Sequence, residues 1–164
     1  MTRAALLASL LVVLATAGCD SAPPEDELLR GRFEATVGGA AQRELRGAAE
    51  ARTVGEGPEA TTTVAMRPGG DVQRLLSVSG PAAAFEAAGT VAIADGGTIA
   101  AYVDELFGGA TYVSGSGQLT ITRADGRSVV GALTATLAGG PTVGSTDRVE
   151  VTASFHAARV EGDG

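Results

Sequence analysis

Apolar and polar residues alternate with a period of two along most of the chain after about residue 31. This alternation is typical of β-strands, in which successive side chains point to opposite faces of a sheet. Glycine or proline separates the runs, so each run predicts one short strand. The alternating positions are Phe33, Ala35 and Val37; Leu45, Gly47, Ala49 and Ala51; Thr62, Val64 and Met66; Leu76, Val78 and Gly80; Val91 and Ile93; Ile99 and Ala101; and Val149, Val151, Ala153, Phe155 and Ala157.

Eight to ten short strands at roughly ten-residue spacing predict an all-β fold, either an antiparallel β-sandwich or a barrel. Two segments are ambiguous. Residues 81–88 start with proline, are rich in alanine and stop before Gly89, which suits either two turns of helix or a crossover loop. Residues 102–107 are equally open. We therefore expect at most one or two short helices.

The strongest predicted hairpin covers residues 119–131. A two-residue loop at its Asp-Gly pair is one alternative, but it would place the apolar positions of the returning strand out of phase with those of the first. A three-residue loop, 124–126, pairs Ile121 with Val129 and matches the apolar faces. Gly126 would then occupy the left-handed position of a bulged turn. We therefore expect the three-residue loop.

The first eighteen residues have the pattern of an export signal. Arg3 precedes an apolar run over residues 4–15, which is shorter than the about 20 residues that a membrane-spanning helix needs. The run ends in Ala15-Thr16-Ala17-Gly18-Cys19. This ending resembles the lipobox of bacterial lipoproteins, with Thr16 where the family usually has leucine. The resemblance implies cleavage between Gly18 and Cys19 and attachment of lipid to the thiol. A conventional signal peptide with an incidental cysteine is the alternative.

Four parts of the chain follow from this interpretation. Residues 1–18 are the signal peptide, 19–30 an acidic tether that starts at lipidated Cys19, 31–160 a single β domain and 161–164 a tail. Cys19 is the only cysteine, so the domain folds without disulfides. The expected partner is membrane lipid through Cys19. The domain is expected in the bacterial cell envelope, outside the cytoplasm, on either the inner or the outer membrane.

Charge and composition exclude several classes of protein. Without Arg3, eleven arginines and nineteen acidic residues remain, so the formal net charge is −8. Such a chain is repelled by phosphate backbones and carries no basic stripe, so nucleic acid is not an expected partner. Lysine is absent, which excludes phosphate-binding loops and Schiff-base chemistry of the usual kind.

Residues with catalytic or ligand-binding chemistry are few. His156 is the sole histidine, and the alternation places it on the solvent face, opposite Phe155. Asp104 and Glu105 are neighbours in a predicted extended segment, so their carboxylates should point to opposite faces. Gly115-Ser116-Gly117 lacks the frame of a nucleophile elbow. Three other acids adjoin glycines and are explained by turns: Asp71, Asp95 and Asp125. No catalytic residue, metal site or cofactor is predicted.

Short strand motifs resemble a family of small uncharacterised bacterial lipoproteins. They include Phe33-x-Ala35-x-Val37-x-Gly39, Gly117-Gln118-Leu119-Thr120-Ile121-Thr122 and Val151-Thr152-x-x-Phe155. The chain departs from the family pattern at Val91 and Leu133, where aromatic residues are common. The resemblance implies an anchored β domain and carries no activity or site residues to this chain.

Three functional classes remain, in this order. The first is a non-catalytic envelope module with a structural or binding role. The second is a carbohydrate- or peptide-binding module, for which Tyr102 and Tyr112 are the only phenol side chains, with no tryptophan to stack on sugars. The third is a hydrolase, which the single histidine disfavours. The sequence does not identify a protein or glycan partner.

Overall fold

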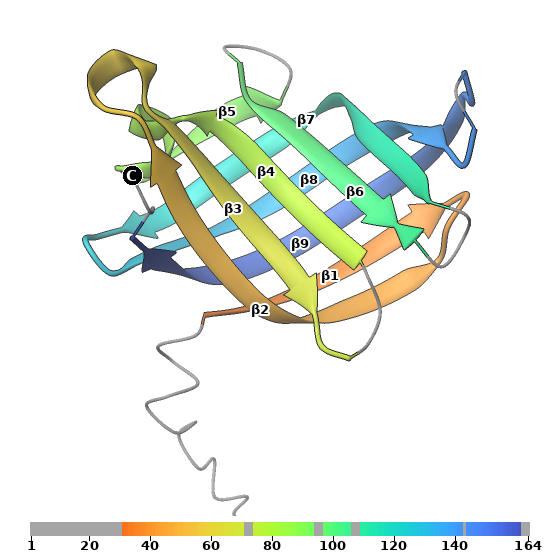
Figure 1. The fold of residues 1–164 in the computed structure, drawn as a ribbon, viewed down its shortest axis with the longest axis horizontal. Coiled ribbons are helices and arrows are strands. Elements are labelled where there is room, and N and C mark those ends of the chain that lie inside the picture. Colours follow the sequence, from red (N-terminus) through yellow and green to blue (C-terminus); the bar gives the residue numbers. More distant parts are fainter. Residues whose placement is uncertain (1–30, 71–73, 94–96, 106–108, 143, 162–164) are drawn as a thin grey trace, which may run out of the picture.

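The β-sheet of this protein closes on itself as an antiparallel barrel (Figure 1). The computed structural model describes residues 31–70, 74–93, 97–105, 109–142 and 144–161. Within these ranges it contains nine strands and two short 3₁₀ turns. The strands are β1 (Arg32–Gly39), β2 (Arg43–Val54), β3 (Thr61–Pro68), β4 (Arg74–Pro81), β5 (Gly89–Ile93), β6 (Ile99–Asp104), β7 (Ala110–Ala124), β8 (Ser128–Gly140) and β9 (Asp147–Val160). The predicted all-β fold is confirmed, and of the two expected architectures the chain adopts the barrel.

The nine strands occupy eight positions around the barrel. The ring runs β1-β2-β3-β4-β6-β7-β8-β9 and returns to β1. The long strand β7 pairs with β6 through residues 110–113 and with β5 through residues 117–121. Strands β5 and β6 therefore lie one after the other along the same edge of β7. A barrel of eight strands is just wide enough for side chains to fill its interior.

Gly31 lies where the first and last strands meet. Beyond the start of β1, residues 50–52 of β2 pair directly with residues 158–160 of β9, in parallel. Gly31 has a φ of 66°, and a Cβ atom at this position would collide with the backbone of Ala49 and Ala158. A residue without a side chain is required for the chain to enter the barrel at this seam.

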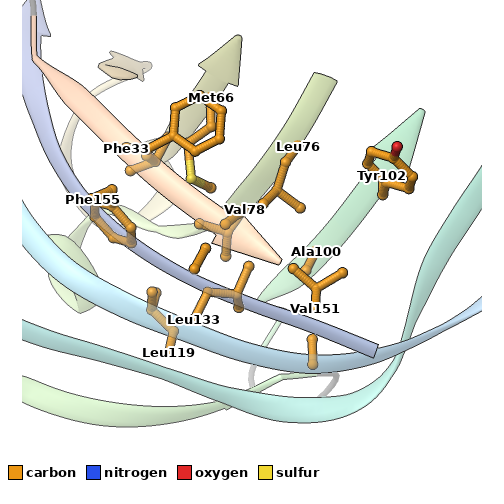
Figure 2. Packing of buried hydrophobic residues seen from close by; sticks show 14 of the residues in the cluster. Phe33, Met66, Leu76, Val78, Ala100, Tyr102, Leu119, Leu133, Val151 and Phe155 are labelled. Carbon is orange, nitrogen blue, oxygen red and sulfur yellow. The ribbon is translucent and has the colours of Figure 1, made fainter. Parts of the chain in front are cut away.

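Apolar side chains fill the barrel, and the outer surface is mostly polar or small. Phe33, Met66, Leu76, Leu133 and Phe155 belong to one buried cluster, which draws on every strand around the barrel (Figure 2). Burial of each such side chain stabilises the fold by about 1.5–3 kcal/mol relative to exposure. Outward-facing positions are held by threonine, serine, alanine, arginine and glutamate. The period-two pattern of the sequence therefore corresponds to inside and outside.

The two ends of the barrel differ in character. At the Phe85 end, on the left of Figure 1, the chain enters β1 and leaves β9, and the 3₁₀ turns η1 (Gly57–Glu59) and η2 (Ala82–Phe85) pack together. Phe85 is fully buried there, and its carbonyl oxygen accepts a 2.8 Å hydrogen bond from Nη2 of Arg159. At the opposite end, the Asp104 end, turns join β1 to β2, β3 to β4, β6 to β7 and β8 to β9.

Residues 81–88 do not form two turns of helix; they cross from β4 to β5, which are not neighbours in the sheet, as the crossover-loop alternative has it. They contain the single turn η2, after which the chain bends into β5. Of the other ambiguous segment, residues 102–104 lie in β6, while 106 and 107 fall outside the described residues.

The register expected for the 119–131 hairpin is wrong by two residues. Ile121 pairs with Gly131 rather than with Val129, although the apolar faces match as predicted. A register shift between Ile121 and Arg123 inserts a bulge that the pattern does not reveal. Gly126 also lacks the expected positive φ.

The carboxylate of Asp125 stabilises this turn instead. Its Oδ1 accepts hydrogen bonds from the backbone nitrogens of Arg127 and Ser128, each at 2.8 Å. These two bonds lower the pKa of Asp125 below its usual range. Asp125 therefore lies in a turn, as predicted. Its own carboxylate, and not a left-handed Gly126, fixes the geometry of that turn.

The inward face of β6 is also the reverse of the one expected. Ile99 is 50% exposed and lies on the outer surface, whereas Ala100 and Tyr102 are buried. Apolar residues occupy both faces of this short segment. Ile99 and Ala101 would point inward in one alternation, and Ala100 and Tyr102 in the other. The barrel selects the second phase because β4 and β7 orient Tyr102 towards the core.

Candidate functional site

Three strands each place a charged side chain on the inward face at the Asp104 end of the barrel. Arg43 opens β2 and is in phase with Leu45, and Arg74 opens β4 in phase with Leu76. Asp104 closes β6 in phase with Tyr102. Alternation along each strand therefore directs all three charges into the barrel.

Asp104 lies between the two arginines. Its side chain is 1% exposed, while those of Arg43 and Arg74 are 25% and 16% exposed. Oδ1 lies 3.3 Å from Nε of Arg74, and Oδ2 lies 3.6 Å from Nε of Arg43. The hydroxyl of Tyr102 donates a 3.0 Å hydrogen bond to Oδ2. The anion of this cluster is almost wholly removed from water, and the two cations are partly buried.

Two stacked tyrosines separate the cluster from the apolar core. Tyr102 and Tyr112 are directly opposite each other on β6 and β7, with ring centroids 6.1 Å apart and planes 22° apart. Figure 2 shows Tyr102 at the margin of the apolar cluster, with its hydroxyl directed away from the other labelled side chains. Burial raises the pKa of Tyr102, and the hydrogen bond to Asp104 raises it further. The phenol therefore stays protonated and continues to donate.

A cavity of about 350 Å³ opens above this cluster. Its floor includes Arg43, Asp104 and Tyr112, and Asp147 lies at its rim. Burial raises the pKa of the Tyr112 phenol, and the negative charges of Asp147 and Asp104 add to the rise. The volume is at the lower end of the range of small-molecule sites. The residues that line the cavity are Ala40, Ala41, Gln42, Arg43, Asp104, Ala110, Tyr112, Pro141 and Asp147.

The side chains of Asp104 and Glu105 point to opposite faces, as predicted, because Asp104 is buried and Glu105 is exposed. The cluster that Asp104 forms was not predicted. A signal was present: Arg43 stands two residues before Leu45, and Arg74 two residues before Leu76. Each arginine thus falls on the apolar phase of its own strand. A charge on that phase at a strand terminus indicates a polar lining at one end of a barrel.

Of the other candidate residues, His156 lies away from this cavity. His156 is on the outer face of β9, partly exposed, in the predicted phase. Gly18, Cys19, Asp71 and Asp95 fall outside the described residues. Among the residues that are described, no group of three His, Cys, Asp or Glu side chains could hold a metal ion. The same ranges contain no helix that is long and apolar enough to cross a membrane.

Comparisons with known proteins return no match. No protein-family model matches the chain, and neither the curated proteins nor the solved structures yield a match. The resemblance to small bacterial lipoproteins therefore stays a prediction from short motifs.

Proposed function

We propose that this chain is a lipid-anchored protein of the bacterial cell envelope whose barrel is a non-catalytic binding module. The ligand is a small polar molecule that enters the cavity at the Asp104 end. The observation that carries the proposal is the buried carboxylate of Asp104, which lines that cavity with Arg43 and pairs with Arg43 and Arg74.

The energetic cost of this burial favours a role beyond closing the barrel. Removing each charge from water costs several kcal/mol, and apolar side chains of similar volume often do as well or better for stability. The rest of the described interior is apolar apart from small hydroxyl side chains such as Thr62 and Thr98. Charged groups retained at the floor of a cavity are typical of binding sites, in which a few polar groups orient the ligand.

The charges also suggest which ligands suit the cavity. Arg43 on the lining offers guanidinium N–H groups, which suit a carboxylate or another hydrogen-bond acceptor at the floor. The ring of Tyr112 offers an apolar surface beside it. Asp147 at the rim suits a donor or an ammonium group on the outer part of the ligand. An amino acid or a short peptide combines these features better than a neutral sugar.

The lining favours binding over hydrolysis. Among the described residues that line the cavity, none is a serine, threonine, cysteine or histidine. The hydroxyl of Tyr102 keeps its proton and donates a hydrogen bond to Asp104, so it is a poor nucleophile. A hydrolase would need a nucleophile and a base within reach of each other.

Tyrosine fluorescence provides the test. Tyr102 and Tyr112 are the only tyrosines and there is no tryptophan, so intrinsic emission reports on this site. We expect free amino acids, dipeptides or dicarboxylates to change the emission saturably, and Arg43→Met to abolish the response. Arg46→Met is the matched control, because Arg46 lies on the outer face of the same strand.

Two results would contradict the proposal. One is a panel of these compounds, with simple sugars included, that leaves both the emission and the melting temperature unchanged. The other is a response that survives Arg43→Met, which would place the ligand elsewhere.

A further inference from the structure

A second hollow lies at the opposite end of the barrel, where the chain enters and leaves. It is an open basin of about 1090 Å³ formed by the β7–β8 turn and the end of β9. Arg123, Arg127 and Arg159 line it, together with Asp125 and Glu161. We call it the arginine basin.

Strand register brings a fourth arginine to its edge. Arg32 at the start of β1 lies directly opposite His156, which also lines the basin. His156 in turn lies opposite Val130, and Val130 opposite Arg123. Four adjacent strands thus contribute to one row on the outer surface, with an arginine at each end of the row.

Arg159 is held in place without losing its charge. Its Nε donates to the carbonyl oxygen of Asp125, and its Nη2 donates to that of Phe85, both at 2.8 Å. Both acceptors are neutral carbonyl oxygens, and no carboxylate of the described residues forms an ion pair with this guanidinium. A cation fixed in this way is preorganised for an anion, because little side-chain entropy remains to be lost on binding.

The acids of the basin compensate only part of its charge. The carboxylate of Asp125 is engaged by the turn nitrogens of residues 127 and 128 and lies 3.6 Å from Nε of Arg123. Arg32 and Arg127 have no carboxylate within 4 Å among the described residues. Glu161 lies on the lining, and Glu86 lies in an adjoining hollow beside Arg159. Among the described residues, four arginines and three acids lie in or beside the basin, on a chain whose net charge is −7.

The basin lies next to the point where the chain enters β1, and this position bears on what it binds. Gly31 enters the barrel beside the backbone of His156 and Ala158, next to the basin. Eleven residues separate it from Cys19, which is at most about 40 Å of extended chain. If Cys19 carries lipid, as proposed above, the end of the barrel held near the bilayer is the one with the basin.

We propose that the arginine basin binds the phosphate groups of anionic phospholipid headgroups, so that the Asp104 end faces away from the membrane. Guanidinium groups pair with phosphate oxygens through two parallel hydrogen bonds. The inference rests on the proposed lipid anchor for its geometry. The basin itself can be tested without the anchor.

The test uses the full chain with Cys19→Ala, which removes the lipid attachment. Sedimentation with vesicles of phosphatidylcholine and phosphatidylglycerol measures binding, and pure phosphatidylcholine vesicles give the background. We expect binding to the mixed vesicles that weakens as salt is raised. Adding Arg32→Gln and Arg127→Gln should weaken it roughly tenfold, because each basic residue near an anionic surface contributes to the attraction. Both side chains are exposed and unpaired by acids, so the fold should persist.

A control pair separates local from global charge. Arg46→Gln with Arg148→Gln removes the same charge from outer surfaces away from the basin, and should leave binding nearly unchanged. Equal loss in both pairs would overturn the proposal, as would equal binding to both kinds of vesicle. If neutralising Glu25, Asp26 and Glu27 is needed before any binding occurs, the acidic tether occupies the basin and the proposal is wrong. Failure of the anchor would instead show as wild-type protein that does not partition with membranes.

Discussion

The negative charge of Asp104 holds its neighbours in place. Its carboxylate is shared by two guanidinium groups and a phenol, with almost no access to water. Asp104→Asn keeps the shape and removes the negative charge with which Arg43 and Arg74 both pair.

We expect this substitution to lower the free energy of unfolding by about 3 kcal/mol, the order found when a buried ion pair loses one partner. Urea unfolding measures it. Glu150→Gln, on the exposed face of β9, is the control and should change stability by less than about 0.5 kcal/mol. Equal stability of the two variants would mean that water already screens the cluster.

The phenol of Tyr102 should resist ionisation for the same reason. Its pKa is raised by burial and then by the carboxylate that accepts its hydrogen bond. The stabilisation from the protonated phenol is fully present below the ordinary tyrosine pKa of about 10 and is lost as pH rises through the higher folded-state value. We therefore expect the ultraviolet signal of tyrosinate to appear together with alkaline unfolding. Titration of Tyr102 near pH 10 in the folded protein would contradict its hydrogen bond to Asp104.

At the level of single elements, two explanations of the stability of the β7–β8 turn can be tested: the carboxylate of Asp125 and a left-handed Gly126. Asp125→Ala removes the acceptor of two backbone N–H groups, so the melting temperature should fall. Gly126→Ala should leave it nearly unchanged, because Gly126 has no positive φ and an added Cβ would meet no atom within 4 Å. If Gly126→Ala lowered the melting temperature more than Asp125→Ala, the left-handed turn predicted from the sequence would be correct.

Alternation predicted the strands well because inside and outside of a barrel differ so strongly in polarity. The outward side of β9, for example, follows directly from the pattern that places His156 opposite Phe155. What the pattern missed depends on neighbouring strands. The phase of β6 was decided by pairing with β4 and β7, and the hairpin register by a bulge near Thr122. The charged cluster was missed because it forms only when Arg43, Arg74 and Asp104 arrive from three separate strands.

For the molecule as a whole, the anchor is the simplest prediction to check. Cys19 is the only thiol in the chain and follows a lipobox-like segment. Cys19→Ala should therefore move the protein from the detergent phase to the aqueous phase, or leave it as uncleaved precursor. Wild type and variant that partition equally would show that the cysteine carries no lipid. The barrel itself should melt at the same temperature in both proteins, because the tether precedes its first strand.

The seam at Gly31 has a consequence for the time at which the barrel forms. Strand β9 pairs with β8, with β1 and with the far part of β2, so the last strand made joins both edges of the sheet. Until those fourteen residues arrive, β1 and β8 remain two unpaired edges, each able to recruit a strand from another chain. Contacts between strands this far apart in the sequence are slow to form. Closure of the barrel therefore waits for β9, and a chaperone that covers open strand edges would protect the sheet during that interval.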